Sequence, residues 1–96
     1  MPTYVSLISF TEDGVEDIAD LPTRDADGRA LLESMGVELV ENYYTLGQYD
    51  EVAVCEAPDD ETMGRAMLAI ASEGNVSTET LRAFSEDEFH ELVGDL

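Results

Sequence analysis

YYTLGQYD, residues 43–50, turns one predicted strand into the next and decides the fold of this chain. Its glycine, Gly47, can adopt the positive φ that a tight reversal needs. The segments on either side, residues 37–46 and 50–57, are rich in the β-branched and apolar side chains that favour strands. The stretch therefore predicts an antiparallel hairpin at the middle of the chain.

Strands and helices alternate on both sides of this hairpin. Strands are expected over residues 3–10, 37–46, 50–57 and 76–84. Helices are expected over residues 11–36, with an interruption at Pro22, over residues 59–73, and from a Ser85–Glu88 capping box to the end. The order β-α-β-β-α-β, followed by a short terminal helix, predicts an α+β, ferredoxin-like fold. Residues 1–96 are expected to form a single domain whose four-stranded antiparallel sheet carries the helices on one face.

Apolar residues at helical spacing predict which helix faces are buried. Val15, Ile18 and Ala19 form one predicted buried face in the first helix. A longer stripe in the second helix is expected to fill the core, and its members are Met63, Ala66, Met67, Ile70 and Ala71. The one cysteine, Cys55, lies in an apolar strand and is expected to be a buried, unreactive thiol in a reducing compartment.

Both faces of the predicted sheet are apolar. In the third strand Val52 and Val54 point to one face, while Ala53 and Cys55 point to the other. Two helices can cover only one of these faces, so the second face is expected to meet either a second copy of the chain or the terminal helix. This pattern predicts a homodimer or a higher homo-oligomer.

The charge balance is strongly acidic, with 23 Asp and Glu residues against four Arg residues and a net charge of −19. Because the acids are spread over every segment, we expect a solvated acidic surface of the halophilic kind, stable where concentrated salt screens its self-repulsion. Nucleic acid is excluded as a partner, since binding it needs clustered basic residues. No apolar run is long enough to span a membrane and no leader segment begins the chain, so a cytoplasmic protein is predicted.

Three segments carry a resemblance to a known family. GQYD at residues 47–50, EAPDDE at 56–61 and GNVSTETLRAF at 74–84 resemble the common segments of the GYD domain family. The resemblance covers essentially the whole chain and implies a ferredoxin-like fold of the dimeric α/β-barrel type, in which two sheets face each other. It implies no activity and no cofactor. Ser77 stands where many relatives have arginine, so an anion site that used that arginine would be incomplete in this chain.

Two residues of the hairpin are candidate site residues. Tyr49 and Asp50 can define the turn, because Asp accepts backbone N–H bonds and Tyr packs its ring while its hydroxyl finds a partner. They can equally contact a ligand. Both interpretations stay open from the sequence.

Arg82 and His90 are two further candidate site residues. Arg82 lies in a strand and is expected either to pair with Glu79, Asp50 or Glu56, or to recognise a carboxylate or a phosphate. His90 is expected at the edge of the terminal helix's apolar stripe, exposed or at an interface. With one histidine and no calcium-loop spacing, no metal site is predicted.

Three functions fit these observations. The first is a small-molecule-binding or regulatory module, a homo-oligomer whose ligand lies between facing sheets near Tyr4, Tyr44, Tyr49 and Arg82. The second is a cofactor-independent oxygenase or isomerase in which Tyr49, Asp50 or His90 handles protons. The third is an oligomeric scaffold with no ligand.

Overall fold

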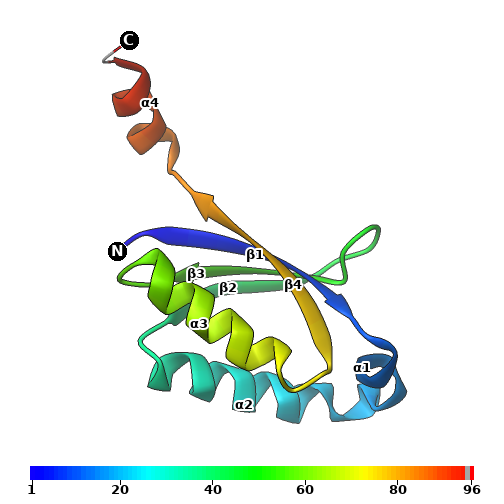
Figure 1. Ribbon diagram of the computed structural model, residues 1–96. Coiled ribbons are helices and arrows are strands. Elements are labelled where there is room, and N and C mark those ends of the chain that lie inside the picture. Colours follow the sequence, from blue (N-terminus) through cyan, green and yellow to red (C-terminus); the bar gives the residue numbers. More distant parts are fainter. Residues whose placement is uncertain (95) are drawn as a thin grey trace.

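A computed structural model describes residues 1–94 and residue 96 of the chain. The elements follow one another as β1 (Thr3–Phe10), α1 (Glu12–Glu16), the 3-10 helix η1 (Ile18–Asp20), α2 (Leu21–Ser34), β2 (Glu38–Tyr44), β3 (Glu51–Glu56), α3 (Asp60–Ala71), β4 (Val76–Ala83) and α4 (Glu86–Gly94). The strands form one antiparallel sheet in the order β2-β3-β1-β4, with α2 and α3 on one face (Figure 1). The predicted α+β, ferredoxin-like fold is confirmed.

The core lies between the sheet and the two long helices. Strand alternation turns Tyr4, Ser6 and Ile8 of β1 toward the helices, and the same face of β3 contributes Ala53 and Cys55. Helix α2 contributes Leu32, and α3 contributes Met63, Ala66 and Met67, which belong to the stripe predicted in residues 59–73. Asp59 begins α3 as its N-cap by accepting a hydrogen bond from the Thr62 N–H at 2.8 Å.

The connection from β1 to α2 is more broken than the sequence predicted. Thr11 caps α1, because its hydroxyl accepts a hydrogen bond from the Gly14 N–H at 3.2 Å, but α1 ends after five residues. Val15 and Ile18 are 55% and 44% exposed, so the prediction that they form a buried face was wrong. Residues spaced by 3.6 positions share one face only if the helix is continuous between them. Here α1 gives way to η1, and α2 then begins at Leu21.

Two turns far apart in the sequence are joined at the end of β1. The Thr11 N–H donates to the Asn75 carbonyl at 3.0 Å, and the Thr11 hydroxyl donates to the Gly74 carbonyl at 2.6 Å. Gly14 is buried against the same segment, and a Cβ added to it would lie 2.1 Å from the Asn75 carbonyl oxygen. Only glycine therefore fits between these two turns.

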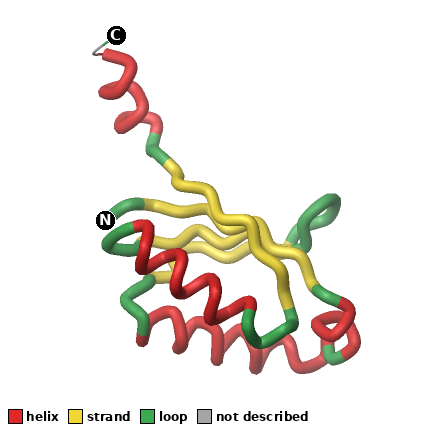
Figure 2. The backbone as a smooth tube through the Cα atoms, viewed as in Figure 1, coloured by secondary structure: helices red, strands yellow, loops and turns green. Residues whose placement is uncertain are grey.

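The face of the sheet turned away from α2 and α3, called the open face below, has no helix over it in the described part of the chain (Figure 2). Its apolar side chains, which strand alternation places there, are Val5, Leu7, Tyr43, Val52, Val54 and Leu81. The terminal helix was one of the two covers expected for this face. Instead α4 continues beyond the end of β4 and points away from the sheet (Figure 1).

The terminal helix itself is left without a packing partner among the described residues. Its apolar side chains Phe89, Leu92 and Val93 are all exposed. Residue 95, which falls within the predicted terminal helix, lies outside the described residues. The protomer thus presents two separate apolar surfaces, the open face and the apolar stripe of α4.

Candidate functional site

The loop between β2 and β3 is held by its own backbone and by one side chain. Gly47 has a φ of +109°, which the sequence pattern required at the reversal. The Thr45 N–H donates to the Asp50 carbonyl at 2.9 Å, and the Thr45 hydroxyl donates to the Tyr49 carbonyl at 2.7 Å. The loop is therefore closed at its base.

Asp50 attaches this loop to the end of the central strand β1. Its carboxylate oxygen Oδ2 accepts a hydrogen bond from the Phe10 N–H at 2.9 Å. Its own N–H donates to the Ile8 carbonyl, also at 2.9 Å. The aspartate of the GQYD segment thus completes the backbone hydrogen bonding where β1 runs past the end of β3.

Tyr49 extends from the same loop to the opposite edge of the sheet. Its hydroxyl donates to the Glu79 carboxylate of β4 at 2.6 Å. That hydrogen bond is the main reason that the pKa of Tyr49 is raised above its usual value. Glu79 pairs with Leu7 and so lies on the open face, which places the Tyr49 contact there as well.

Replacing Asp50 by alanine is expected to lower the free energy of unfolding by about 1–3 kcal/mol, because the half-buried Phe10 N–H would lose its acceptor. The measurement is urea unfolding followed by circular dichroism in concentrated KCl. Asp27→Ala is the matched control, since Asp27 is exposed on α2 and its removal changes the net charge by the same amount. Equal stability of the two variants would contradict a structural role for Asp50.

Tyr4 and Arg82 lie together at the far end of β1, on the helix side of the sheet. Tyr4 is buried and its hydroxyl donates to the Asp60 carboxylate. Burial, and after it this hydrogen bond, raises the pKa of Tyr4. The Arg82 guanidinium lies 4.9 Å from the centre of the Phe84 ring and 5.8 Å from that of Tyr4.

The expected ion pair of Arg82 is not formed. In the described part of the chain no carboxylate lies within 4.0 Å of its guanidinium, so the predicted partners Glu79, Asp50 and Glu56 are all wrong. The reason is that β4 is an edge strand and leaves Arg82 exposed, with the two aromatic rings rather than a carboxylate beside its guanidinium.

Tyr44 lies on the helix side of β2, with its hydroxyl 2.6 Å from both carboxylate oxygens of Asp25 on α2. Its ring stacks on Phe10 at a centroid distance of 6.3 Å. Burial, and then the contact with Asp25, raises the pKa of Tyr44. The polar neighbours of Tyr44 were not identified from the sequence; they are Asp25, Asn42 and Glu51. Strand alternation along β2 already placed Asn42 and Tyr44 on the same face of the sheet.

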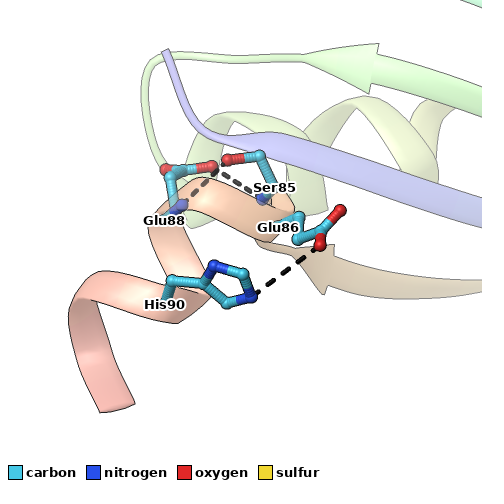
Figure 3. A network of polar contacts seen from close by, with 4 residues as sticks. All are labelled: Ser85, Glu86, Glu88 and His90. Atoms are coloured by element: carbon cyan, nitrogen blue, oxygen red, sulfur yellow. Dashed lines mark hydrogen bonds and ion pairs between the residues drawn. The ribbon is translucent and has the colours of Figure 1, made fainter. Parts of the chain in front are cut away.

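His90 is exposed on α4, and its Nε2 lies 3.8 Å from a Glu86 carboxylate oxygen (Figure 3). The capping box predicted at the start of this helix is confirmed: the Ser85 N–H donates to Glu88 at 2.9 Å, and the Glu88 N–H donates to the Ser85 hydroxyl at 3.1 Å (Figure 3). The hydrogen bond from the Ser85 N–H stabilises the ionised carboxylate and, with the nearby Ser85 hydroxyl, holds the pKa of Glu88 below its usual value.

The predicted site residues do not gather at one place. Asp50 and His90 lie at opposite ends of β4. Asp50 bonds to Phe10, which pairs with the first residue of β4, and His90 belongs to the helix that follows the last residue of this strand. Tyr4, Tyr44 and Arg82 are on the helix side of the sheet, and Tyr49 reaches the open face. A single ligand between two facing open faces would therefore meet Tyr49 but not the other three.

Cys55 is buried as predicted, with 0% of its surface exposed. Burial raises the pKa of its thiol to about 11, so the thiolate needed for nucleophilic chemistry is disfavoured at neutral pH.

Among residues 1–94 and 96, no three His, Cys, Asp or Glu side chains come together as a metal-binding group. None of the described helices has both the length and the apolar composition to cross a bilayer.

Comparison with known proteins places this architecture in a family. The family model for the GYD domain matches residues 4–93. A Thermus thermophilus protein, "Glutamine synthetase and cystathionine beta-lyase binding protein", is 45% identical over 84 residues, which cover 86% of this chain and 88% of that protein.

Solved structures agree with this assignment. The crystal structure of TTHA0845, also from Thermus thermophilus, matches with a TM-score of 0.58 and 30% identity, over 88% of this chain and 94% of that one. A glycine-to-threonine mutant of Rv3291c has a TM-score of 0.56 at 18% identity, over 91% of this chain and 54% of that one, and shows the fold alone. The family resemblance of the GQYD segment is thus confirmed, and the chain belongs to the GYD domain family.

Proposed function

We propose that this protein is a regulatory binding module, which contacts other proteins as a homodimer and responds to a small molecule. The observation that carries the proposal is the open face, a continuous apolar surface in a family with a member named for binding two enzymes. Asp50 is bonded to the Phe10 N–H, Tyr49 to Glu79, and His90 lies apart from both on α4, which favours a binding role over proton-transfer catalysis.

A second copy of the chain is the occupant proposed for the open face. Val5, Val54 and Leu81 stand side by side across three strands, and exposed apolar patches of this kind mark interaction surfaces. The exposed stripe of α4 would pack on the same partner, because a helix that projects from one protomer can reach the body of the other. The pairing of two sheets is the arrangement that the family resemblance implies.

The acidic surface supports a salt-rich cytosol as the working environment. In the described part of the chain the single ion pair within 4.0 Å joins His90 and Glu86, so no arginine neutralises a carboxylate by direct contact. Dissolved cations would then screen the charge.

The homodimer is tested by replacing Val54 with glutamate. In a two-fold symmetric dimer the charge enters the interface twice, and burial without a counter-ion is expected to weaken association by about 3 kcal/mol or more, at least a hundredfold in Kd. Light scattering coupled to size exclusion in 2 M KCl should show a dimer for the wild type and a monomer for the variant. Leu68→Glu, on the 73% exposed outer side of α3, is the control and should stay dimeric.

A wild-type monomer in this experiment would overturn the dimer. The protein-binding role is tested separately, by titrating the wild type against the glutamine synthetase and the cystathionine β-lyase encoded in the same genome, with interferometry as the readout. Saturable binding to either enzyme supports the role. Absence of binding to both, while the Thermus thermophilus relative binds its own enzymes, would remove it.

A further inference from the structure

A cavity of about 160 Å³ lies between the helix face of the sheet and the helices α2 and α3, on the side opposite to the open face. Its walls are largely apolar and include Ile8, Leu39, Met67 and Ile70. Two other lining residues, Arg29 and Glu73, are exposed, so the cavity reaches the surface. An engineered cavity of about 150 Å³ is large enough for benzene, so this one can hold the side chain of a small metabolite.

Two polar atoms at this cavity are buried and have no hydrogen-bond partner in the described structure. They are the Nε of Arg24, a donor that carries positive charge, and the Oδ1 of Asn42, an acceptor. Native proteins leave few buried polar groups unpaired, because each such group has lost its water without gaining a partner. Arg24 uses another nitrogen, Nη2, to donate to the Gly14 carbonyl at 2.9 Å, and its Nε is still unused.

A half-buried carboxylate, that of Glu51, lines the same cavity. Within the described residues it has no cationic group within 4.0 Å. Burial raises the pKa of Glu51 by more than the neighbouring Asn42 amide and Tyr44 hydroxyl lower it, as expected for a carboxylate that lacks a positive partner. Of the other acids that line the cavity, Asp25 is already engaged by the Tyr44 hydroxyl, and Glu73 is exposed to solvent.

The cavity is therefore lined by a guanidinium and an amide that each keep one hydrogen-bonding atom unused, and by a carboxylate without a counter-ion. The two unused atoms have less than 1 Å² of accessible surface, so the side chains of Arg24 and Asn42 would turn toward a bound ligand. We propose that the cavity binds an α-amino acid with an aliphatic side chain no larger than that of leucine. The ligand carboxylate would meet Arg24, its ammonium group would meet Glu51 and Asn42, and its side chain would enter the chamber. Any ligand with only one charge would leave either the guanidinium or the carboxylate without a partner.

The small molecule to which the proposed regulatory module responds would then be an α-amino acid. Binding of the amino acid does not depend on the proposed function, whereas its role as a regulator rests on it. The site lies within one protomer and on the other side of the sheet from the proposed dimer contact. Amino-acid binding and dimerisation can therefore fail independently, and Val54→Glu should bind the amino acid as the wild type does.

The test is calorimetric titration of the full chain with L-leucine in 2 M KCl, with thermal unfolding in parallel. We expect saturable binding and a higher Tm. The analogues 4-methylpentanoate, which lacks the ammonium group, and 3-methylbutylamine, which lacks the carboxylate, are each expected to bind at least about tenfold more weakly, because each leaves one charged group of the cavity unpaired. Arg24→Gln and Glu51→Gln should weaken leucine binding by a similar factor, whereas Arg65→Gln, exposed on α3 outside the cavity, should not.

The variant Gly28→Leu distinguishes a loss of leucine binding from a loss of folding. Gly28 lines the cavity from α2, and a Cβ added there would meet the nearest atom, Cδ1 of Ile70, at an ordinary 3.9 Å. The larger residue favours the helix and fills the chamber, so the variant should keep or raise its Tm and lose leucine binding. Absence of a titration signal with folded wild type, which would mean a water-filled cavity, overturns the proposal. Equal binding of leucine and both analogues, or leucine binding by Gly28→Leu with wild-type affinity, does so too.

Discussion

Replacing Gly14 by alanine is expected to lower the free energy of unfolding by about 3 kcal/mol or more, because overpacking against backbone cannot be relieved by a change of rotamer. The added Cβ would lie 2.1 Å from the Asn75 carbonyl oxygen. That carbonyl also accepts the Thr11 N–H at 3.0 Å, so the turn cannot move away without breaking this bond. For a domain of this size the loss corresponds to a decrease in Tm of about 12–24 °C.

The measurement is thermal unfolding by circular dichroism in concentrated KCl. Gly64→Ala is the matched control, since Gly64 lies in α3 with nothing within 4 Å of the added Cβ. In that helix alanine is expected to raise stability by about 0.5–1 kcal/mol relative to glycine. If Gly14→Ala were as stable as Gly64→Ala, the close contact between the two turns would not exist in solution.

Salt is expected to have an effect of comparable size. Two like charges about 10 Å apart repel by about 0.4 kcal/mol in water, and a chain with a net charge of −19 contains many such pairs. Between about 0.1 M and 1 M salt the Debye length falls from about 10 Å to about 3 Å, which removes most of this repulsion. We therefore expect loss of structure in dilute buffer and a Tm that rises by more than about 10 °C between 0.1 M and 2 M KCl, equivalent to about 2 kcal/mol.

A charge-reduced variant separates electrostatic screening from a general effect of salt on the hydrophobic core. Four exposed acids without hydrogen bonds are replaced by their amides in this variant: Glu16→Gln, Asp27→Asn, Glu33→Gln and Glu91→Gln. It should fold at lower KCl concentration than the wild type if repulsion is the cause. A wild-type Tm that is the same at 0.1 M and 2 M KCl would contradict the proposed salt-rich environment.

The order of strands and helices could be predicted from the sequence because it depends on local signals. The GQYD hairpin, the Asp59 cap and the Ser85–Glu88 capping box each act within a few residues, and the structure confirms them. The stripe that includes Met63 and Met67 was predictable because α3 is continuous over twelve residues.

The errors arose where local periodicity was broken. Val15 and Ile18 were predicted on one helix face, but α1 ends between them. The pairing of β2 also shifts between Leu39 and Glu41, an irregularity that the sequence did not indicate. Neither a short helix nor a strand irregularity changes the average hydrophobic pattern enough to be recognised from the residues alone.

The polar neighbours of the candidate site residues could not be predicted from the sequence for a different reason. Asp25 and Tyr44, or Arg24 and Asn42, are separated by about twenty residues and meet only because α2 packs across β2. A carboxylate partner within the fold was one of two expectations for Arg82, and it failed because the exposure of an edge strand depends on the strand order of the complete sheet.

The interior position of β1 has a consequence for synthesis of the chain. β1 is made first, yet its two neighbours in the sheet are β3 and β4, and β4 ends only at Ala83. A nascent chain therefore carries β1 with at least one edge unpaired until β4 has also left the ribosome, and contacts this distant in sequence slow folding. We infer that the complete sheet forms only after β4 has left the ribosome, and that chaperones meet an acidic, incompletely paired sheet before then.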